Sequence, residues 1–170
     1  MTAVAGGVSD QNPLRFALRD ATPGDAATIV DFNRAMARET EGKHLDPERL
    51  QRGVERVLGD PARGQYFVAV VDDPDGDGQS GRVVGQLMIT REWSDWRDGW
   101  FLWIQSVYVD PAFRRRGVYR ALHHHVLQCA RAASDVCGVR LYVEPENARA
   151  KKTYHALGMR HAYDVFEQDP

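Results

Sequence analysis

The sequence predicts an α/β fold built on one mixed, mostly antiparallel sheet of six to seven strands. Segments with strand and helix patterns alternate in the order β-α-α-β-β-β-α-β-α-β, with no internal repeat. Two longer strand segments, residues 83–91 and 100–109, are joined through residues 94–99. A helical segment separates residues 104–109 from residues 139–143, and such a crossover makes two strands parallel.

Composition limits the chain to one domain and a few classes of function. The 170 residues carry a net charge of −2, so no basic field indicates nucleic acid or an anionic membrane as a partner. Residues 1–12 are small and polar, and we expect them to form a flexible tail before a single domain over residues 13–170. Cys129 and Cys137 do not suggest a disulfide framework, which fits a cytoplasmic protein.

The first elements show clear start signals. Residues 14–19 alternate as a strand does. Thr22 and Asp25 flank Pro23 as a capping box does, and Asp46-Pro47 marks a second helix start. The core-facing residues of the first helix are expected to be Ala26, Ile29, Phe32 and Met36. Those of the second helix are expected to be Leu50, Val54 and Leu58.

The later elements follow from periodicity and from turn residues. Strands are expected over residues 65–71, 83–91, 100–109, 139–143 and 163–167, and helices over residues 118–133 and 147–157. The segment with Asp73, Asp75, Asp77 and Gly78 matches the opening of a calcium loop. Val84 stands where that loop needs a bidentate Glu, so we expect a solvated hairpin connection instead.

The most informative stretch runs from a strand into a helix. The strand of residues 104–109 ends at Asp110-Pro111, and Arg114, Arg115, Arg116 and Gly117 follow directly before the next helix. A helix N-terminus presents unpaired backbone N–H groups and the positive end of the helix dipole, which together bind phosphate. Glycine lets the backbone approach a ligand closely. Taken alone, an Arg-Arg-Arg-Gly run is more often a solvated turn.

A second signature accompanies this one. The first motif reads Arg114, two residues, Gly117, Val118 and Tyr119, and the second comprises Asn147, Ala150, Tyr154, Gly158 and Met159. Both motifs, in this order and at this separation, resemble the GNAT superfamily of N-acetyltransferases over about residues 14–167. The resemblance implies a sheet with a central splayed parallel pair, helices on both faces, and acetyl-CoA as cosubstrate.

The resemblance also implies roles for individual residues. Backbone groups of Val107, Tyr108 and Val109 would hold the pantetheine arm, and Asn147 and Ala150 would contact it. The pyrophosphate would lie against Arg114, Arg115, Arg116, Gly117, Val118 and Tyr119. Tyr154 would protonate the departing thiolate after direct attack by a primary amine, with no acyl-enzyme and no metal. On spacing alone, Tyr154 is better read as a core residue, since it shares a helix face with Ala150 and Leu157.

Three departures from the family pattern stand out. Tyr119 occupies a position where the family has Gly or Ala, so either its side chain points away from the phosphates or the loop geometry differs. The central strand offers Trp103, Gln105 and Ser106 but no carboxylate to serve as base. After Met159 there is room for one final strand rather than two, so the sheet edge is shorter or is completed by a second subunit in a homodimer.

Acidic and aromatic residues flank the expected position of the acetyl end of acetyl-CoA. We expect Glu92 to be the general base, because a carboxylate among tryptophans would be partly desolvated and therefore more basic. Glu39, Glu41 and a relayed water are the alternatives for the base. The acceptor pocket, for an amine of small-molecule type, is expected to involve Glu39, Glu41, Glu92, Trp93 and Gln105. The alternatives are solvated acids and ordinary cross-strand packing of the tryptophans.

Two other functions compete with this one: a non-catalytic acyl-CoA sensor of the same fold, and an RNA-binding module that uses the arginine run. The absence of a wider basic stripe argues against the RNA-binding function.

His123, His124 and His125 are adjacent on a helix, so they point in different directions and are not expected to share a metal ion.

Overall fold

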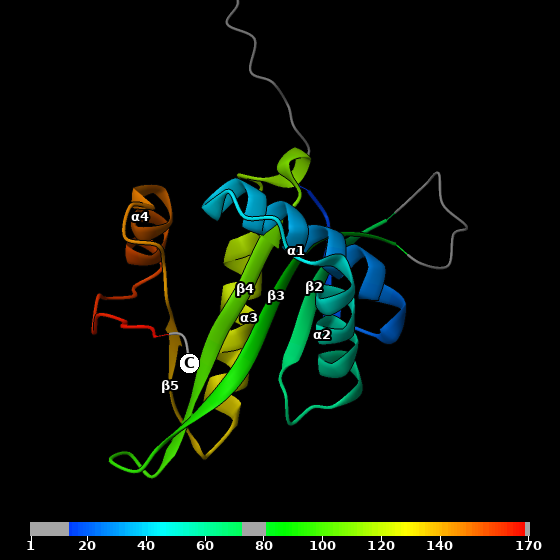
Figure 1. Ribbon diagram of the computed structural model, residues 1–170. Coiled ribbons are helices and arrows are strands. Elements are labelled where there is room, and N and C mark those ends of the chain that lie inside the picture. Colours follow the sequence, from blue (N-terminus) through cyan, green and yellow to red (C-terminus); the bar gives the residue numbers. More distant parts are fainter. Residues whose placement is uncertain (1–13, 73–80, 169–170) are drawn as a thin grey trace, which may run out of the picture.

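The computed structural model describes residues 14–72 and 81–168 (Figure 1). The expected tail of residues 1–12 and the calcium-like positions Asp73, Asp75, Asp77 and Gly78 lie outside the described residues.

A single mixed sheet organises the described chain, which confirms the predicted fold class. Its strands are β1 (Ala17–Asp20), β2 (Gln65–Val71), β3 (Arg82–Ser94), β4 (Gly99–Val109) and β5 (Val136–Leu141), and they pair in sequence order. The first four strands are antiparallel, and β5 joins β4 in parallel. The described sheet therefore has five strands, slightly fewer than the six to seven expected.

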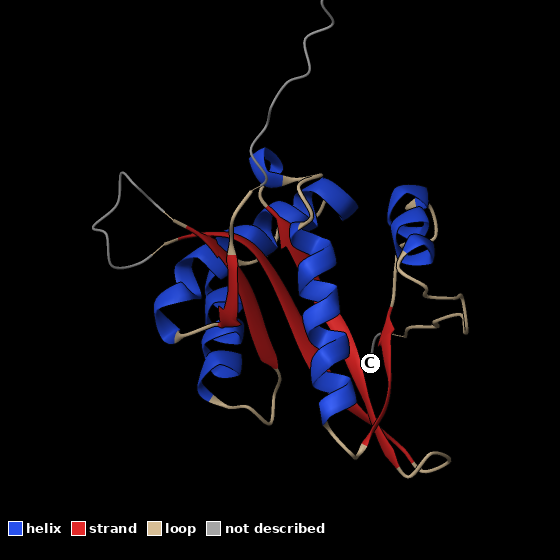
Figure 2. Ribbon diagram, turned by 180° about the vertical axis from the view of Figure 1, so that it is seen from behind, coloured by secondary structure: helices blue, strands red, loops and turns tan. Residues whose placement is uncertain are grey.

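Helices cover both faces of the sheet. The helices α1 (Ala26–Glu41) and α2 (Pro47–Gly59) lie on one face, and α3 (Val118–Ala132) lies on the other (Figures 1 and 2). A short helix, α4 (Ala148–Ala156), follows β5. The larger core lies between the sheet and α3, which contributes Val118, Leu122 and Val126. The smaller core joins α1 and α2 to the sheet through Ile29, Val30, Val54 and Tyr66.

The expected final strand over residues 163–167 is wrong. Residues 161–168 are described but form no strand. Tyr163, Val165 and Phe166 are 69%, 65% and 95% exposed, so the alternation of apolar residues does not correspond to a buried face. A strand needs backbone partners and packing as well as a pattern of period two.

The strand β5 begins three residues earlier than the expected range of residues 139–143. Val136 and Val139 both pack against the larger core. Between them, Gly138 lies so close to the ring of Phe101 that a Cβ atom would stand 2.7 Å from its Cε1. Gly138 is therefore a strand residue that accepts a close aromatic neighbour.

A buried polar network anchors α1 to the sheet. Gln86 on β3 donates from Nε2 to Oδ1 of Asn33 at 2.7 Å, and Asn33 donates from Nδ2 to the hydroxyl of Tyr66 at 3.2 Å. Gln86 is fully buried, and Asn33 and Tyr66 are each 5% exposed. Such a network fixes the helix position more specifically than apolar packing does.

The start of α1 is held by Asp25, as the capping box predicts. Its carboxylate accepts hydrogen bonds from the backbone N–H of Thr22 at 2.7 Å and from both terminal nitrogens of Arg19 at 2.7 and 2.9 Å. Burial opposes ionisation of Asp25, but the hydrogen bonds from Arg19 and Thr22 outweigh it and hold its pKa below the ordinary value.

Replacing Asp25 with Asn should therefore destabilise the fold in a pH-dependent way. The contribution of the carboxylate is complete above the unfolded-state pKa of about 3.9 and is lost as the pH falls through the lower folded-state pKa. We expect urea unfolding at pH 7 to show a loss of about 1–2 kcal/mol and a much smaller difference at pH 2.5. Asp31→Asn, whose carboxylate is 73% exposed, is the control and should change little. An equal loss at both pH values would contradict this account.

Candidate functional site

The two parallel strands separate half-way along β4. Their pairing runs from Trp100 opposite Val136 to Ile104 opposite Leu141 and then stops, while β4 continues to Val109 (Figure 1). On its other side β4 stays paired with β3 to its end. The segment of residues 105–109 therefore has one edge that faces no strand of the described sheet.

The backbone groups of Val107 and Val109 point to this open edge. The N–H of Asp110 donates to the carbonyl of Val84 on β3 at 2.9 Å. Successive residues of an antiparallel strand direct their backbone groups to opposite sides, so those of residues 107 and 109 face away from β3. An extended ligand can pair with this edge as an additional strand does.

A β-bulge marks the point of separation. Met88 faces Ser106 and Ile89 faces Ile104, so Gln105 is an extra residue in β4. Its Nε2 donates to Oγ1 of Thr90 at 2.9 Å, and its Oε1 accepts a hydrogen bond from the hydroxyl of Tyr142. A bulge leaves a backbone N–H outside the regular ladder, where it is available to a ligand.

The loop after β4 leads into the N-terminus of α3. Gly117 precedes this 15-residue helix with a φ of 87°, and a Cβ atom there would meet nothing within 4 Å. Arg115 also has a positive φ, of 65°. Both residues thus take left-handed conformations that keep the first backbone N–H groups of α3 open, as an anion site requires.

Arg114 is partly buried and is held by two hydrogen bonds. Its Nε donates to the carbonyl of Val109 at 2.9 Å, and its NH2 nitrogen donates to Oε2 of Glu39 at 2.6 Å. Arg115 and Arg116 are exposed. Of the three arginines expected at the phosphate, Arg114 therefore shapes the loop, while the other two are placed to attract anions.

Glu39 links α1 to this loop. Its Oε1 accepts a hydrogen bond from the hydroxyl of Tyr108 at 2.7 Å, while its other oxygen binds Arg114. Partial burial opposes ionisation of Glu39, but these hydrogen bonds outweigh it and lower its pKa. Burial and the neighbouring carboxylate raise the pKa of Tyr108 to about 12. The carboxylate expected to meet the acceptor is thus already engaged, a contact between distant residues that no local pattern reveals.

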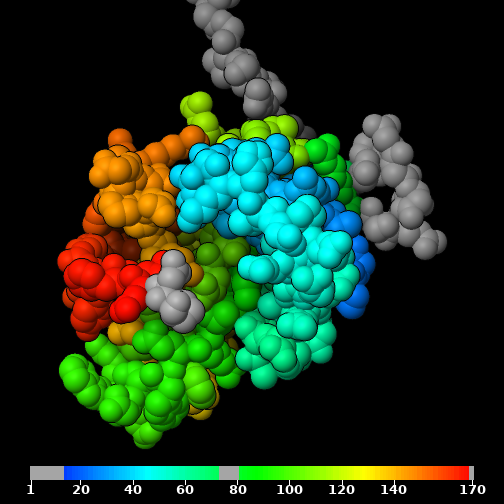
Figure 3. All heavy atoms as spheres, viewed as in Figure 1, coloured from blue at the N-terminus to red at the C-terminus, as the bar shows by residue number. Residues whose placement is uncertain are grey.

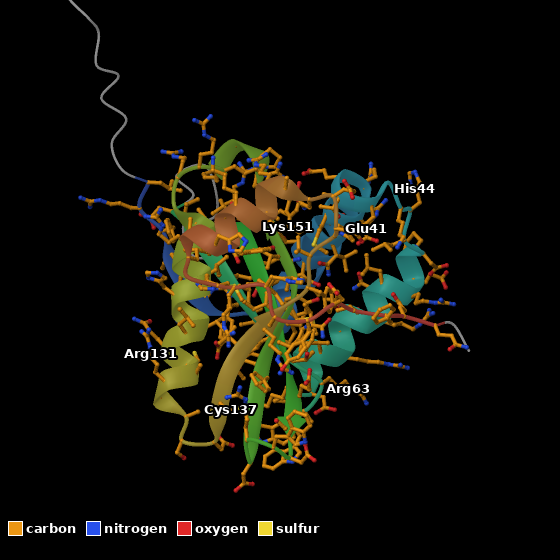
Figure 4. The ribbon with its side chains drawn as sticks, turned by 90° about the vertical axis from the view of Figure 1, so that its left-hand side faces the viewer. Glu41, His44, Arg63, Arg131, Cys137 and Lys151 are labelled. Atoms are coloured by element: carbon orange, nitrogen blue, oxygen red, sulfur yellow. The ribbon has the colours of Figure 1, made fainter. Side chains whose placement is uncertain are left out.

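The other acids expected near the acceptor are also paired. Glu41, at the end of α1, lies 2.6 Å from Lys43, close to His44 (Figure 4). Glu92 lies 2.6 Å from Arg140, whose guanidinium stacks 3.5 Å from the centre of the Phe101 ring. The Glu92 side chain is 43% exposed, so it is not enclosed by tryptophans.

The tryptophans mainly support the β3–β4 hairpin. Trp93 packs edge to face on Trp100 at 5.0 Å between ring centres, and Trp96 is 92% exposed. Trp103 is the one that lies near the bulge, where its ring is 5.7 Å from that of Tyr142. The sequence did not single out Tyr142 or Thr90, because neither belongs to a motif.

The helix α4 carries Tyr154, which contacts the first turn of α3 through Tyr119. Asn147 begins the helix, and its Oδ1 accepts a hydrogen bond from the N–H of Ala150 at 3.0 Å. Tyr154 is partly buried, and burial raises its pKa. Its ring meets that of Tyr119 edge to face at 6.0 Å. Tyr119 thus contacts α4 through its ring.

The described residues include neither a cluster of metal ligands nor a membrane-spanning helix. No three His, Cys, Asp or Glu residues within the described ranges lie close enough to hold a metal ion. None of the described helices is long and apolar enough to span a membrane.

In the space-filling view, α1 and α4 stand on either side of a hollow over β4 (Figure 3).

A sequence model of the acetyltransferase (GNAT) family matches residues 27–159. The chain belongs to this acetyltransferase family. A possible acetyltransferase from Clostridium difficile 630 is 43% identical, with a TM-score of 0.81 over 91% of this chain and 97% of that one. No curated protein matches the sequence of this GNAT protein.

A second similar structure shares the fold at lower identity. The enzyme AAC(6')-Iy, in complex with the bisubstrate analogue CoA-S-monomethyl-acetylneamine, is 17% identical, with a TM-score of 0.69 over 92% of this chain and 98% of that one. At this identity the likeness shows the GNAT fold alone.

Proposed function

We propose that this GNAT protein transfers an acetyl group from acetyl-CoA to a primary amine of a small molecule by direct attack. The observation that carries the proposal is the open edge of β4, which leads past Val109 into a helix N-terminus with an open glycine. An extended arm that ends in a pyrophosphate matches this arrangement, because the edge offers strand-like hydrogen bonds and the helix offers N–H donors.

The residues of this site fit coenzyme A in detail. Backbone groups of Val107 and Val109 would hold the pantetheine arm, with Tyr108 between them fixed by Glu39. The backbone of residues 115–119 would surround the pyrophosphate. Asn147 and Ala150 at the start of α4 would lie along the arm on the opposite side of the splay. Coenzyme A supplies the activated thioester.

In the proposed reaction, one bond forms, one bond breaks and two protons move. The amine nitrogen bonds to the acetyl carbon, and the carbon–sulfur bond breaks with its electron pair on sulfur. Tyr154 gives its proton to that sulfur, and the nitrogen loses one to a base. A backbone N–H at the Gln105 bulge is suited to stabilise charge on the carbonyl oxygen. Because burial raises the pKa of Tyr154, the hydroxyl is protonated at neutral pH and ready to donate.

The acceptor would approach from the side of α1 and the β3–β4 hairpin. Glu41, Trp93 and Gln105 are the proposed contacts, and Glu39 acts there through Tyr108 and Arg114. The bisubstrate analogue bound by AAC(6')-Iy supports a small-molecule amine as the class of acceptor. We assign the base to Glu92, which must exchange Arg140 for the amine in order to accept its proton.

The exposed apolar residues of the C-terminal segment support a further part of the proposal. Tyr163, Val165 and Phe166 are largely exposed beyond β5, which is the last strand of the described sheet. A second copy of the chain would cover them in a homodimer.

Acetyl-CoA should raise the melting temperature through selective binding to the native state. Dephospho-CoA should do so as well, because the pyrophosphate is the main anchor. Gly117→Glu should abolish both shifts, since it places bulk and negative charge in a left-handed position at the helix start. Gly53→Glu, on the surface of α2, is the control and should retain them. An unchanged melting temperature at millimolar acetyl-CoA would refute the proposed function.

Removing the hydroxyl of Tyr154 should slow turnover without weakening coenzyme A binding. Tyr154→Phe keeps the ring and its contact with Tyr119. We expect kcat for thiol release, measured with an amine found by screening a diverse library, to fall roughly a hundredfold, the lower end for a positioned acid. Coenzyme A binding by calorimetry should stay within twofold. If kcat is retained, Tyr154 is a packing residue only.

Replacing Glu92 with Gln should lower kcat/KM and remove the acidic limb of its pH profile, because the amide cannot accept a proton. Arg140→Gln is the matched control: it removes the same ion pair but keeps the carboxylate, so the acidic limb should persist. If the two variants behave alike, Glu92 serves only to hold Arg140, and the proton leaves through water or another acid.

A further inference from the structure

Helix α3 contains two buried polar side chains that the proposed reaction leaves without a role. The hydroxyl of Tyr119 and both ring nitrogens of His123 are shielded from solvent and find no hydrogen-bond partner among residues 14–72 and 81–168. His123 is 1% exposed. Buried polar atoms without partners are rare in native proteins because they cost stability, so each one requires an explanation.

Of the two, Tyr119 faces the proposed acid. Its ring lies 6.0 Å from that of Tyr154 in an edge-to-face arrangement, and 6.1 Å from that of His123. Tyr119 stands two residues after Gly117, on the first turn of α3, whereas Tyr154 belongs to α4. The contact therefore connects the helix of the phosphate site to the helix of the acid.

Tyr154 has to lose its proton in surroundings that do not favour the phenolate. Burial raises its pKa, so the anion formed on proton transfer is poorly solvated. Burial and the nearness of Tyr154 also raise the pKa of Tyr119. Tyr119 thus keeps its proton while Tyr154 gives one up, and its hydroxyl is a donor with no acceptor among the described residues.

We propose that Tyr119 is a positioning residue for Tyr154: its ring orients the ring of the acid, and its hydroxyl donates a hydrogen bond to the Tyr154 oxygen as the proton passes to sulfur. This assignment rests on the proposed function. The electron pair of the Tyr154 O–H bond stays on its oxygen, Tyr119 remains protonated, and the phenolate regains a proton from water after the thiol departs. The hydroxyl that lacks a partner at rest thus gains one during the reaction.

The variant Tyr119→Phe separates this role from packing. It keeps the ring, so the fold and the Tyr154 contact should survive. Because the variant removes an unsatisfied buried hydroxyl, the melting temperature of the ligand-free protein should rise by roughly 2–4 °C. We expect kcat to fall about tenfold, the effect of one hydrogen bond to a charged group. The dissociation constant of coenzyme A should not change.

A double-mutant cycle with Tyr154→Phe provides the decisive measurement. If Tyr119 acts through the Tyr154 oxygen, Tyr119→Phe should cost nothing further once that oxygen is gone. His123→Leu is the control, because it removes the other unsatisfied polar group of α3 and should raise the melting temperature without lowering kcat.

The proposal is overturned if Tyr119→Phe lowers kcat equally in both backgrounds, if kcat does not change, or if the loss lies in coenzyme A affinity, which would place the hydroxyl on the cosubstrate arm. These outcomes differ from failure of the proposed function. In that case the wild type would neither bind coenzyme A nor release thiol from acetyl-CoA.

Discussion

The arrangement depends on one strand that is hydrogen-bonded on both sides for only half of its length. After Ile104, β4 keeps β3 as a neighbour but loses β5. Backbone N–H and C=O groups cannot be buried without partners, so this edge must remain accessible to water or to a ligand. The edge stays open because β5 and the following helix α4 diverge from β4. The helix α3 begins after the loop at the end of β4 (Figure 2).

Charge around the open edge is balanced locally. Glu39 binds Arg114, Glu41 binds Lys43, and Glu92 binds Arg140, each at 2.6 Å. Three partly buried groups of the candidate site are instead neutral at rest: the phenols of Tyr119 and Tyr154 and the amide of Gln105. Neutral donors in a site of low polarity interact strongly with charge that develops on a ligand, since little solvent competes with them.

Local patterns in the sequence predicted most of the fold and the outline of the site. The caps at Asp25, Asp46 and Asn147 and the glycine before α3 are short-range signals, and the structure has them where expected. Contacts over long sequence distances could not be predicted in this way. They include the bond between Glu39 and Arg114, the pairing of Glu92 with Arg140, and the bulge at Gln105, which depends on register with β3. The expected last strand was wrong because a pattern of period two does not specify a partner.

Under the proposed function, the link from Glu39 to Arg114 would couple the two halves of the site. One end of the link belongs to α1, and the other belongs to the loop that precedes α3. A ligand that shifts this carboxylate and guanidinium would change the binding free energy of the other ligand. Linkage is reciprocal, so a given factor by which the first ligand changes the affinity of the second applies equally in the reverse direction. If both subsites are occupied as proposed, this ion pair would therefore link the occupancy of each subsite to the affinity of the other.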